Sequence, residues 1–450
     1  MGYTYLPSQE SNSNKFDVST LGLQICYVLK SITNIFASTF LVSFIVHINE
    51  TEPLSASLSS ISLYYIAFYL TFSIIYFLCS FIVDKTNRVW MYRLGILIKG
   101  IFIVSVVFIG KELSKFVLLA GFIGGFANGV FYSAFNVLKG EMVPRRQMSK
   151  FSAVNAVLNK VVNIVFPIVL GALIDFSSYT YVAIGVLILT IIELSVTFMI
   201  KSKKPEGSSF DFFKFIKSLK LKDPNTKRIK NIYSLALLYG ARTLIGTLFS
   251  IVTIYTFKTN LNLGIFTSIS AIISVASLLI IKRFTKEGKR AWLIVMLISI
   301  LVGSTILVAF NMNNWTYILF NISQAITICF SDFCFDVERT VIVKKTGHYS
   351  DTAEHQCIVE LCLSLSRILS FVIMFVMGIC FDVLGMKIML IVSSLIVSVS
   401  MILMMFIEKT ESKYPFENIP EANQNEKTLS NQTSARLPFI DENVKDDKES

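Results

Sequence analysis

Charged residues are scarce in this sequence. They make up 16% of its 450 residues, whereas a typical soluble domain has about 25%. Hydrophobic residues account for 54% instead. Apolar stretches of about 18 residues or more recur along the whole chain, and each is long enough to cross a hydrocarbon layer of about 30 Å. These features exclude most soluble folds and predict an all-α membrane protein with many transmembrane helices.

Several functional signatures are also missing. The chain has no P-loop, which argues against nucleotide hydrolysis. It has only 3 histidines, none paired at i, i+4, and its 7 cysteines show no metal-type spacing. We therefore expect no enzyme activity, no metal and no cofactor. The first 20 residues are polar and do not form a cleavable signal peptide, so the first span is expected to act as its own insertion signal.

The formal net charge of +11 could indicate a nucleic-acid partner, but its location argues otherwise. Hydropathy and flanking charges predict twelve spans. Their approximate bounds are 21-46, 58-82, 89-109, 116-138, 151-174, 181-200, 231-256, 263-282, 291-310, 315-337, 356-381 and 386-407. One alternate set of connecting loops carries about 25 Lys and Arg, and the other carries about four. Because positive loops resist translocation, the rich set is expected to be cytoplasmic, together with both termini.

The chain divides into five segments. Residues 1-20 form an N-terminal tail, 21-200 a six-helix bundle, 201-230 a linker, 231-407 a second six-helix bundle, and 408-450 a polar tail expected to be disordered. In the linker, apolar residues recur at i, i+3, i+4 and i+7, with lysines on another face. This pattern predicts a basic amphipathic helix on the membrane surface, or a solvated linker helix without lipid contact.

The two halves contain an internal repeat. At a spacing of 207 residues, Lys160 matches Arg367 and Asp175 matches Asp382. At a spacing of 212 residues, Lys30 matches Arg242. Matches in the same order and at similar spacing favour duplication of a six-helix unit, which is how many transporter folds are built. The sequence therefore predicts two pseudo-symmetric six-helix bundles.

The loop after the second span reads SFIVDKTNR, with Asp84, Lys85 and Arg88 in an acidic and basic pattern. With the twelve spans, this motif resembles the signature loop of the major facilitator superfamily, and the resemblance covers nearly all of residues 20-407. Two glycines of the family pattern are replaced, the second by Asn87, a residue that tolerates left-handed backbone. The resemblance implies that Asp84, Lys85 and Arg88 form a gating loop that helps to hold one access state; ordinary loop charges are the alternative.

Four basic residues lie within predicted spans. Lys30, Lys160, Arg242 and Arg367 are each about ten residues, or about 15 Å, from the predicted cytoplasmic end of a helix. Charges at this depth are costly, so they are expected to face a cavity or a partner. Because the family resemblance places these spans around a central cavity, we predict that the four residues bind substrate.

Carboxylates form a second set of charges within the spans. Asp332 and Asp336 are one turn apart, and Glu360 lies two turns before Arg367. They are interpreted as proton carriers or as ion-pair partners that lock helices together, in which case Arg367 pairs with Asp332 or Glu360. Glu193 and Lys99 also lie within spans, but the sequence assigns Glu193 no partner and leaves Lys99 free to reach the membrane surface.

The resulting prediction is a secondary active transporter that works by alternating access, is coupled to protons, and carries a small organic, anionic solute. A multidrug or peptide exporter is an alternative, and a non-transporting receptor or assembly protein on the same scaffold is another. The expected partners are a small-molecule substrate, protons and the lipid bilayer, with no nucleic acid. We expect a monomer in the plasma membrane.

Overall fold

The structure of the chain is a computed structural model. It describes residues 17–83, 85–143, 145–201, 210–219, 224–284, 290–345 and 352–413. Over these residues the chain consists of helices and connecting turns, without strands. Asp84 and most of the two predicted tails lie outside the described residues.

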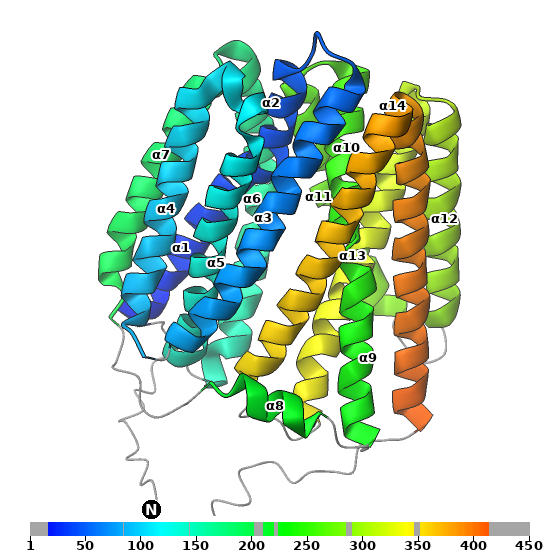
Figure 1. The fold of residues 1–450 in the computed structure, drawn as a ribbon. Coiled ribbons are helices and arrows are strands. Elements are labelled where there is room, and N and C mark those ends of the chain that lie inside the picture. The colour runs from blue at the N-terminus through cyan, green and yellow to red at the C-terminus, as the bar shows by residue number, and fades with distance from the viewer. Residues whose placement is uncertain are drawn as a thin grey trace, which may run out of the picture.

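Two groups of helices lie side by side (Figure 1). The first group comprises α1 (Val18–Ile35), α2 (Leu41–Ile48), α3 (Leu54–Ile82), α4 (Arg88–Ile109), α5 (Val117–Met142), α6 (Arg145–Phe176) and α7 (Tyr179–Val196). The second group comprises α9 (Pro224–Tyr239), α10 (Arg242–Phe257), α11 (Asn260–Phe284), α12 (Arg290–Phe310), α13 (Asn314–Lys345) and α14 (Thr352–Lys413). The short helix α8 (Phe212–Ser218) lies between them in the chain.

Eleven helical stretches are long and apolar enough to cross a membrane. The last of them, Ala353–Ile407, has 55 residues, which at about 1.5 Å per residue is far longer than a bilayer is thick. It contains a break at Asp382, where φ is 48° and the helical geometry is interrupted. This stretch therefore supplies two spans, and the prediction of twelve helices in two bundles is confirmed.

Two spans are irregular at their middle. The first span passes from α1 into a π-helical turn, η1 (Phe36–Phe40), before α2 begins. The seventh span is divided into α9 and α10 at Gly240 and Ala241. π-Helical turns and breaks of this kind alter which side chains face a neighbour, and they occur often at functional sites.

The two halves contact each other through α3 with α14 and through α6 with α11. At both contacts, glycine allows close approach. A Cβ on Gly378 of α14 would lie 2.9 Å from the Cβ of Leu58 in α3, and a Cβ on Gly171 of α6 would clash with the carbonyl group of Asn260 at the start of α11. Gly171 and Gly378 are also equivalent positions in the sequence repeat.

The repeated aspartates cap helices of the opposite half. Asp175 accepts hydrogen bonds from the backbone N–H groups of Asn260 (3.1 Å) and Leu261 (2.8 Å) and from the side chain of Asn260 (2.9 Å). Asp382 accepts one from the backbone N–H of Ser55 at 2.6 Å. A carboxylate at a helix N-terminus satisfies free N–H groups and complements the helix dipole, so both aspartates hold the halves together at the same end of the molecule.

Helix α8 forms where the amphipathic pattern predicts it, but its apolar face contacts protein. Phe212 packs against Phe77 of α3, with ring centroids 5.0 Å apart, and both Phe212 and Phe215 are buried. The backbone N–H of Asp211 donates to Glu354 of α14 at 2.9 Å. The helix therefore bridges the two halves, because its apolar face is covered by α3 and α14, while Phe213 on the other side is 72% exposed.

Candidate functional site

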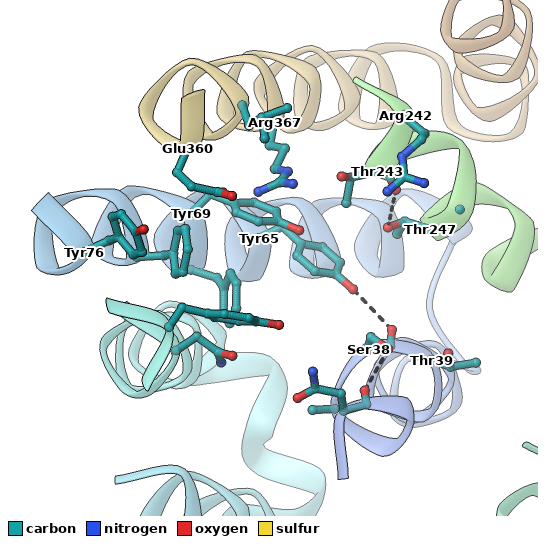
Figure 2. A pocket seen from close by; sticks show the side chains of 18 of the residues that line it. Ser38, Thr39, Tyr65, Tyr69, Tyr76, Arg242, Thr243, Thr247, Glu360 and Arg367 are labelled. Carbon is teal, nitrogen blue, oxygen red and sulfur yellow. Dashed lines mark hydrogen bonds between the residues drawn. The ribbon is translucent and has the colours of Figure 1, made fainter. Parts of the chain in front are cut away.

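A cavity of about 710 Å³ lies between the two halves. The first half contributes side chains from η1, α3 and α5, and the second half contributes side chains from α10, α13 and α14. Figure 2 shows aromatic residues on α3, hydroxyl groups on η1 and α10, and charged residues on α14 and α10 around this space. The two irregular spans both border it, since Ser38 belongs to η1 and Arg242 begins α10.

The aromatic wall of the cavity comes mainly from α3. Tyr65 and Tyr69 are stacked, with centroids 5.9 Å apart and planes inclined by 15°. Phe371 of α14 stacks on Tyr65 at 4.5 Å, so the wall also joins the two halves. The hydroxyl of Tyr65 donates to the carbonyl oxygen of Ser38 at 3.2 Å, which fixes the ring against η1 (Figure 2). This part of the cavity is therefore an aromatic wall built from both halves.

Arg242 and Asp332 form an ion pair at the cavity surface. The guanidinium group of Arg242 contacts both oxygens of Asp332, and the hydroxyl of Tyr239 donates to the same carboxylate. The side chains of Arg242 and Asp332 are 30% and 38% exposed. Arg242 occupies this position because α9 ends at Tyr239 and α10 begins at Arg242. Its charge is therefore compensated within the protein.

Further along the same side of the cavity, Arg339 links two carboxylates. It lies 2.9 Å from Asp336 and 3.9 Å from Glu360. Glu360 also accepts a hydrogen bond from Gln356 at 3.1 Å. Asp336, Arg339 and Glu360 all line the cavity. This arrangement was not evident from the sequence, which suggested Asp332 or Glu360 as partners for Arg367.

Arg367 has a different environment. It lines the cavity, with its guanidinium carbon 5.1 Å from the centre of the Tyr69 ring. Among the described residues it forms no salt bridge, and its buried Nε has no hydrogen-bond acceptor. Figure 2 shows Arg367 and Glu360 on the same wall of the cavity. The π-face of Tyr69 compensates part of the positive charge, but no described residue supplies a carboxylate partner.

Lys30 lies behind the cavity wall and does not line the cavity. Its Nζ is 3.6 Å from the centre of the Phe131 ring and 3.1 Å from that of Tyr132, and the residue is 3% exposed. Tyr132 belongs to the cavity lining, so its ring separates Lys30 from the open space. Within the described part of the chain, Nζ of Lys30 has no hydrogen-bond acceptor.

The structure pairs Lys99 with Glu193, two charges that had no partner assigned from the sequence. Nζ of Lys99 lies 3.1 Å from Glu193, and both residues are buried. Lys99 reaches the cavity lining, whereas Glu193 is completely buried behind it. Removing one partner of a buried ion pair is strongly destabilising, because the other charge is left buried without compensation. This pair therefore joins α4 to α7 inside the first half.

Lys160 is half-buried on α6 and does not line the cavity. The structure thus places Arg242 and Arg367 at the cavity and Lys30 and Lys160 outside it. The carboxylates Asp332, Asp336 and Glu360 all lie at the cavity. That any of these residues binds substrate or carries a proton stays a prediction.

These features can be set against known proteins. A family model described as Major Facilitator Superfamily matches residues 26–348, which is more than half of the chain. The chain belongs to the major facilitator superfamily. Because this is a family of membrane transporters, membership supports the prediction that the chain is not an enzyme.

The sequence is similar to those of two bacterial proteins. "Uncharacterized protein YqgE" of Bacillus subtilis (strain 168) is 25% identical over 258 residues, covering 56% of this chain and 59% of the relative. "Uncharacterized protein in sodM 3'region" of Geobacillus stearothermophilus is 25% identical over 132 residues, covering 28% of this chain and 62% of the relative. The match therefore spans less than two thirds of the length of each relative.

Solved structures of this superfamily share the fold. The nucleoside transporter NupG has a TM-score of 0.61 at 17% identity, with 87% of this chain and 99% of the other covered. A POT family transporter in complex with 5-aminolevulinic acid has a TM-score of 0.64 at 12% identity, covering 88% and 96%. A bacterial homologue of the iron transporter ferroportin in the inward-facing state has a TM-score of 0.62 at 14% identity, covering 87% and 97%.

The structure includes Lys85 and Arg88 of the gating loop that the superfamily resemblance implies. Lys85 is exposed and Arg88 is buried at the start of α4, while Asp84 lies outside the described residues. Asn87 has φ of −71° and caps α4 by accepting a hydrogen bond from Val89 N–H at 3.1 Å. Asn87 does not adopt the left-handed backbone that its residue type tolerates; its side chain serves as a helix cap instead.

Several cavity residues were not predicted. They are neutral polar residues on η1, α5 and α10 and at the end of α1, namely Asn34, Ser38, Thr39, Asn128, Asn136, Thr243, Thr247 and Ser250. Serine and threonine are frequent at helix–helix contacts in membranes, so residue type alone does not distinguish a packing role from a cavity position. The spacing of Thr243, Thr247 and Ser250 at i, i+4 and i+7 was the available signal, since these positions share one helix face.

Proposed function

We propose that the chain is a secondary active transporter that carries a small organic anion across the membrane by alternating access. The observation that carries the proposal is Arg367, a guanidinium group on the wall of a central cavity without a carboxylate partner among the described residues. A charged side chain at the centre of a membrane helix costs about 2.5–3.5 kcal/mol. A bound anion supplies the missing partner, and membership of a transporter family supports movement of that anion.

The charge balance of the site supports an anion over a cation. The described side chains that line the cavity include one more basic than acidic residue. The basic residues are Lys99, Arg242, Arg339 and Arg367, and the acidic residues are Asp332, Asp336 and Glu360. Because this excess lies in a partly dehydrated space, it is screened weakly and favours a ligand with one negative charge.

Proton coupling follows from the ion pair between Arg242 and Asp332. When Asp332 binds a proton, it loses its charge, and the uncompensated charge of Arg242 increases the attraction of the cavity for the anion at Arg367. An anion and a proton then bind together, because each strengthens the binding of the other. The proposed coupling is symport of one proton with the anion, with Asp332 as the carrier and Asp336 and Glu360 as the nearby carboxylates that can exchange protons with it.

The function is tested with the full chain in proteoliposomes. Uptake is measured for a panel of aromatic and aliphatic carboxylates, for the zwitterion alanylalanine and for the hydrophobic cation tetraphenylphosphonium. We expect carboxylate uptake that falls about 10- to 100-fold in Arg367→Gln, because a charge-assisted hydrogen bond contributes roughly 1.5–3 kcal/mol, and that partly recovers in Arg367→Lys. Uptake of every carboxylate at the unmodified rate in Arg367→Gln would contradict the proposal.

Coupling has a separate test. In the Asp332→Asn variant, carboxylate uptake should no longer respond to an imposed pH gradient, although binding of the anion is retained. The matched comparison is Asp336→Asn, which changes the neighbouring carboxylate and leaves Asp332 in place. Full dependence on the pH gradient in Asp332→Asn would exclude this residue as the proton carrier.

A peptide carrier is the second candidate. Glu360 and Arg367 lie two turns apart on α14, on the same wall of the cavity (Figure 2). Opposite charges at this separation suit the amino and carboxyl groups of a short peptide. Uptake of alanylalanine in preference to simple carboxylates would favour this function, as would loss of that uptake in Glu360→Gln. Binding of ligands without any transport would instead favour a receptor on the same scaffold.

The remaining expectations are part of the same proposal. The loop charges favour an orientation with both termini in the cytoplasm, and the transporter is expected to act as a monomer in the plasma membrane. Labelling of single cysteines by a membrane-impermeant reagent tests the orientation. A cysteine replacing exposed Glu52, in the loop between α2 and α3, should be labelled from outside the cell, and one replacing exposed Lys85 should not.

A further inference from the structure

We infer that the organic anion is an aromatic monocarboxylate, whose ring packs against Tyr69 and whose carboxylate binds Arg367. This inference rests on the proposed function and adds the substrate class. Two features of the cavity carry it: a set of parallel rings that is partly open to the cavity, and a single guanidinium group beside it without a carboxylate partner among the described residues.

The parallel rings come from both halves of the molecule. Tyr65, Tyr69 and Phe371 have pairwise inclinations of 15°, 18° and 17°, so their planes are nearly aligned. Phe371 is completely buried and Tyr65 is 7% exposed, whereas Tyr69 is half-buried. Tyr69 is thus the member of the set that offers surface to a ligand. Aromatic groups gain about 0.5–1.5 kcal/mol from stacked or edge-to-face contact beyond the burial of area.

Phe68 and Phe72 extend this wall along α3. Their rings are parallel within 2° at a centroid distance of 6.5 Å, and both line the cavity. Tyr132 of α5 meets Phe72 edge-to-face at 6.2 Å and also lines the cavity. Phe68 is nearly perpendicular to Tyr65 and Tyr69, at 78° and 85°, so a flat ligand parallel to Tyr69 meets Phe68 edge-to-face. A flexible aliphatic chain would fill the same space without these stacked and edge-to-face contacts.

Arg367 determines where the anionic group lies. Its guanidinium carbon is 5.1 Å from the centre of the Tyr69 ring, so a ring beside Tyr69 brings its substituent to the guanidinium group. The planar guanidinium can donate two parallel hydrogen bonds to one carboxylate, and it stacks on aromatic faces at the same time. The position of Arg367 thus favours a carboxylate attached directly, or by a short link, to an aromatic ring.

The neighbouring charges limit the ligand to one negative group. Arg242 is occupied by Asp332, and Arg339 is occupied by Asp336. Glu360 lies on the same wall as Arg367 (Figure 2) and would repel a second anionic substituent. Near the hydroxyl end of Tyr65, Figure 2 shows the side chains of Ser38, Thr243 and Thr247, whose hydroxyl groups suit a neutral hydrogen-bonding substituent on the ring.

Three small probes separate the contributions of ring and charge. They are 4-hydroxybenzoate, its ring-saturated counterpart 4-hydroxycyclohexanecarboxylate, and the neutral 4-hydroxybenzamide. Binding to the full chain in nanodiscs is measured by isothermal titration calorimetry. We expect 4-hydroxybenzoate to bind at least tenfold more tightly than either of the other two probes.

Variants then assign each difference to a residue. Tyr69→Leu should remove the preference for the aromatic acid over the saturated acid, and Tyr69→Phe should keep it. Arg367→Gln should remove the preference for the acid over the amide. Phe122→Leu is the matched control, because Phe122 is an aromatic residue that is 52% exposed on α5 and does not line the cavity; it should keep both preferences.

The outcomes distinguish this inference from the proposed function. Equal affinity for the two acids, or a preference that survives in Tyr69→Leu, would overturn the aromatic substrate class. If both acids still bound more tightly than the amide through Arg367, the transport of organic anions would stand. Equal binding of the amide and the acids would overturn both.

Discussion

The basic residues within the spans occupy different positions in the two halves of the molecule. In the second half, Arg242 and Arg367 lie at the cavity. At the equivalent positions of the first half, Lys30 is covered by the rings of Phe131 and Tyr132, and Lys160 lies outside the cavity. The first half thus contributes mainly aromatic and neutral polar surface, and the second half contributes most of the charges. The two halves therefore share a helical scaffold but present different side chains to the cavity.

The chemistry of the side chains accounts for part of this difference. A guanidinium group is planar and weakly hydrated, so it can stack on an aromatic ring and bind a carboxylate at the same time. A lysine ammonium is compact and more strongly hydrated, and in the first half the Lys99 ammonium is paired with Glu193 within the bundle. The paired charge in the first half joins two helices, whereas Arg367 has no carboxylate partner among the described residues, as the proposed anion site requires.

The largest expected loss of stability is that of the Glu193→Gln variant. Removal of this carboxylate leaves Lys99 buried without its ion-pair partner, and breaking a buried pair typically costs about 3–5 kcal/mol. We expect a clear fall in the thermal unfolding temperature of the purified protein, measured by intrinsic fluorescence. The double variant Glu193→Gln with Lys99→Met should recover stability. A single variant as stable as the original chain would show that the first-half pair is not structural.

A smaller effect is expected for Gly240→Ala, which tests the support for Arg242 in the second half. A Cβ at this position would lie 2.5 Å from the carbonyl oxygen of Leu363 and 2.6 Å from the Cβ of Ser366 on α14. Overpacking of this kind typically costs about 1–3 kcal/mol. Helix α9 must move away from α14, so anion uptake should fall. Gly303→Ala on α12 is the matched control, because a Cβ there meets nothing within 4 Å and Gly303 does not line the cavity.

The smallest loss of stability is expected at the end of the molecule where the equivalent residues Asp175 and Asp382 cap helices of the opposite half. Asp175→Asn and Asp382→Asn each weaken a helix cap between the halves, and loss of a cap costs roughly 0.5–2 kcal/mol. Each variant should open the contact at this end more often, which increases labelling of a cysteine introduced at Ser57, a buried residue of α3 near Ser55. Unchanged labelling in the double variant would mean that these caps do not hold the end closed.

Much of the fold could be predicted from the sequence because the signals for membrane helices are local. Apolar runs define the spans, and positive loops separate them. The repeat of Asp175 and Asp382 pointed to equivalent positions, but not to their capping of the opposite half, because those contacts join residues 85 and 327 positions apart.

The site could be predicted only in part. Charged residues within predicted spans drew attention to Asp332, Asp336, Glu360, Arg242 and Arg367, and all five line the cavity. Lys30 and Lys160 do not line the cavity, because depth along a helix does not determine which side of the helix faces the cavity. Lys30 points to the rings of Phe131 and Tyr132 on α5, and its position depends on packing between α1 and α5 that has no local signature.

The most direct test of the difference between the halves uses the equivalent residues Arg367 and Lys160. The affinity of the full chain in nanodiscs for 4-hydroxybenzoate is compared in Arg367→Gln and Lys160→Gln. If the second half supplies the charge, Arg367→Gln should lose about 10- to 100-fold in affinity, and Lys160→Gln should bind as tightly as the unmodified chain. Equal losses in the two variants, or a loss only in Lys160→Gln, would contradict this account.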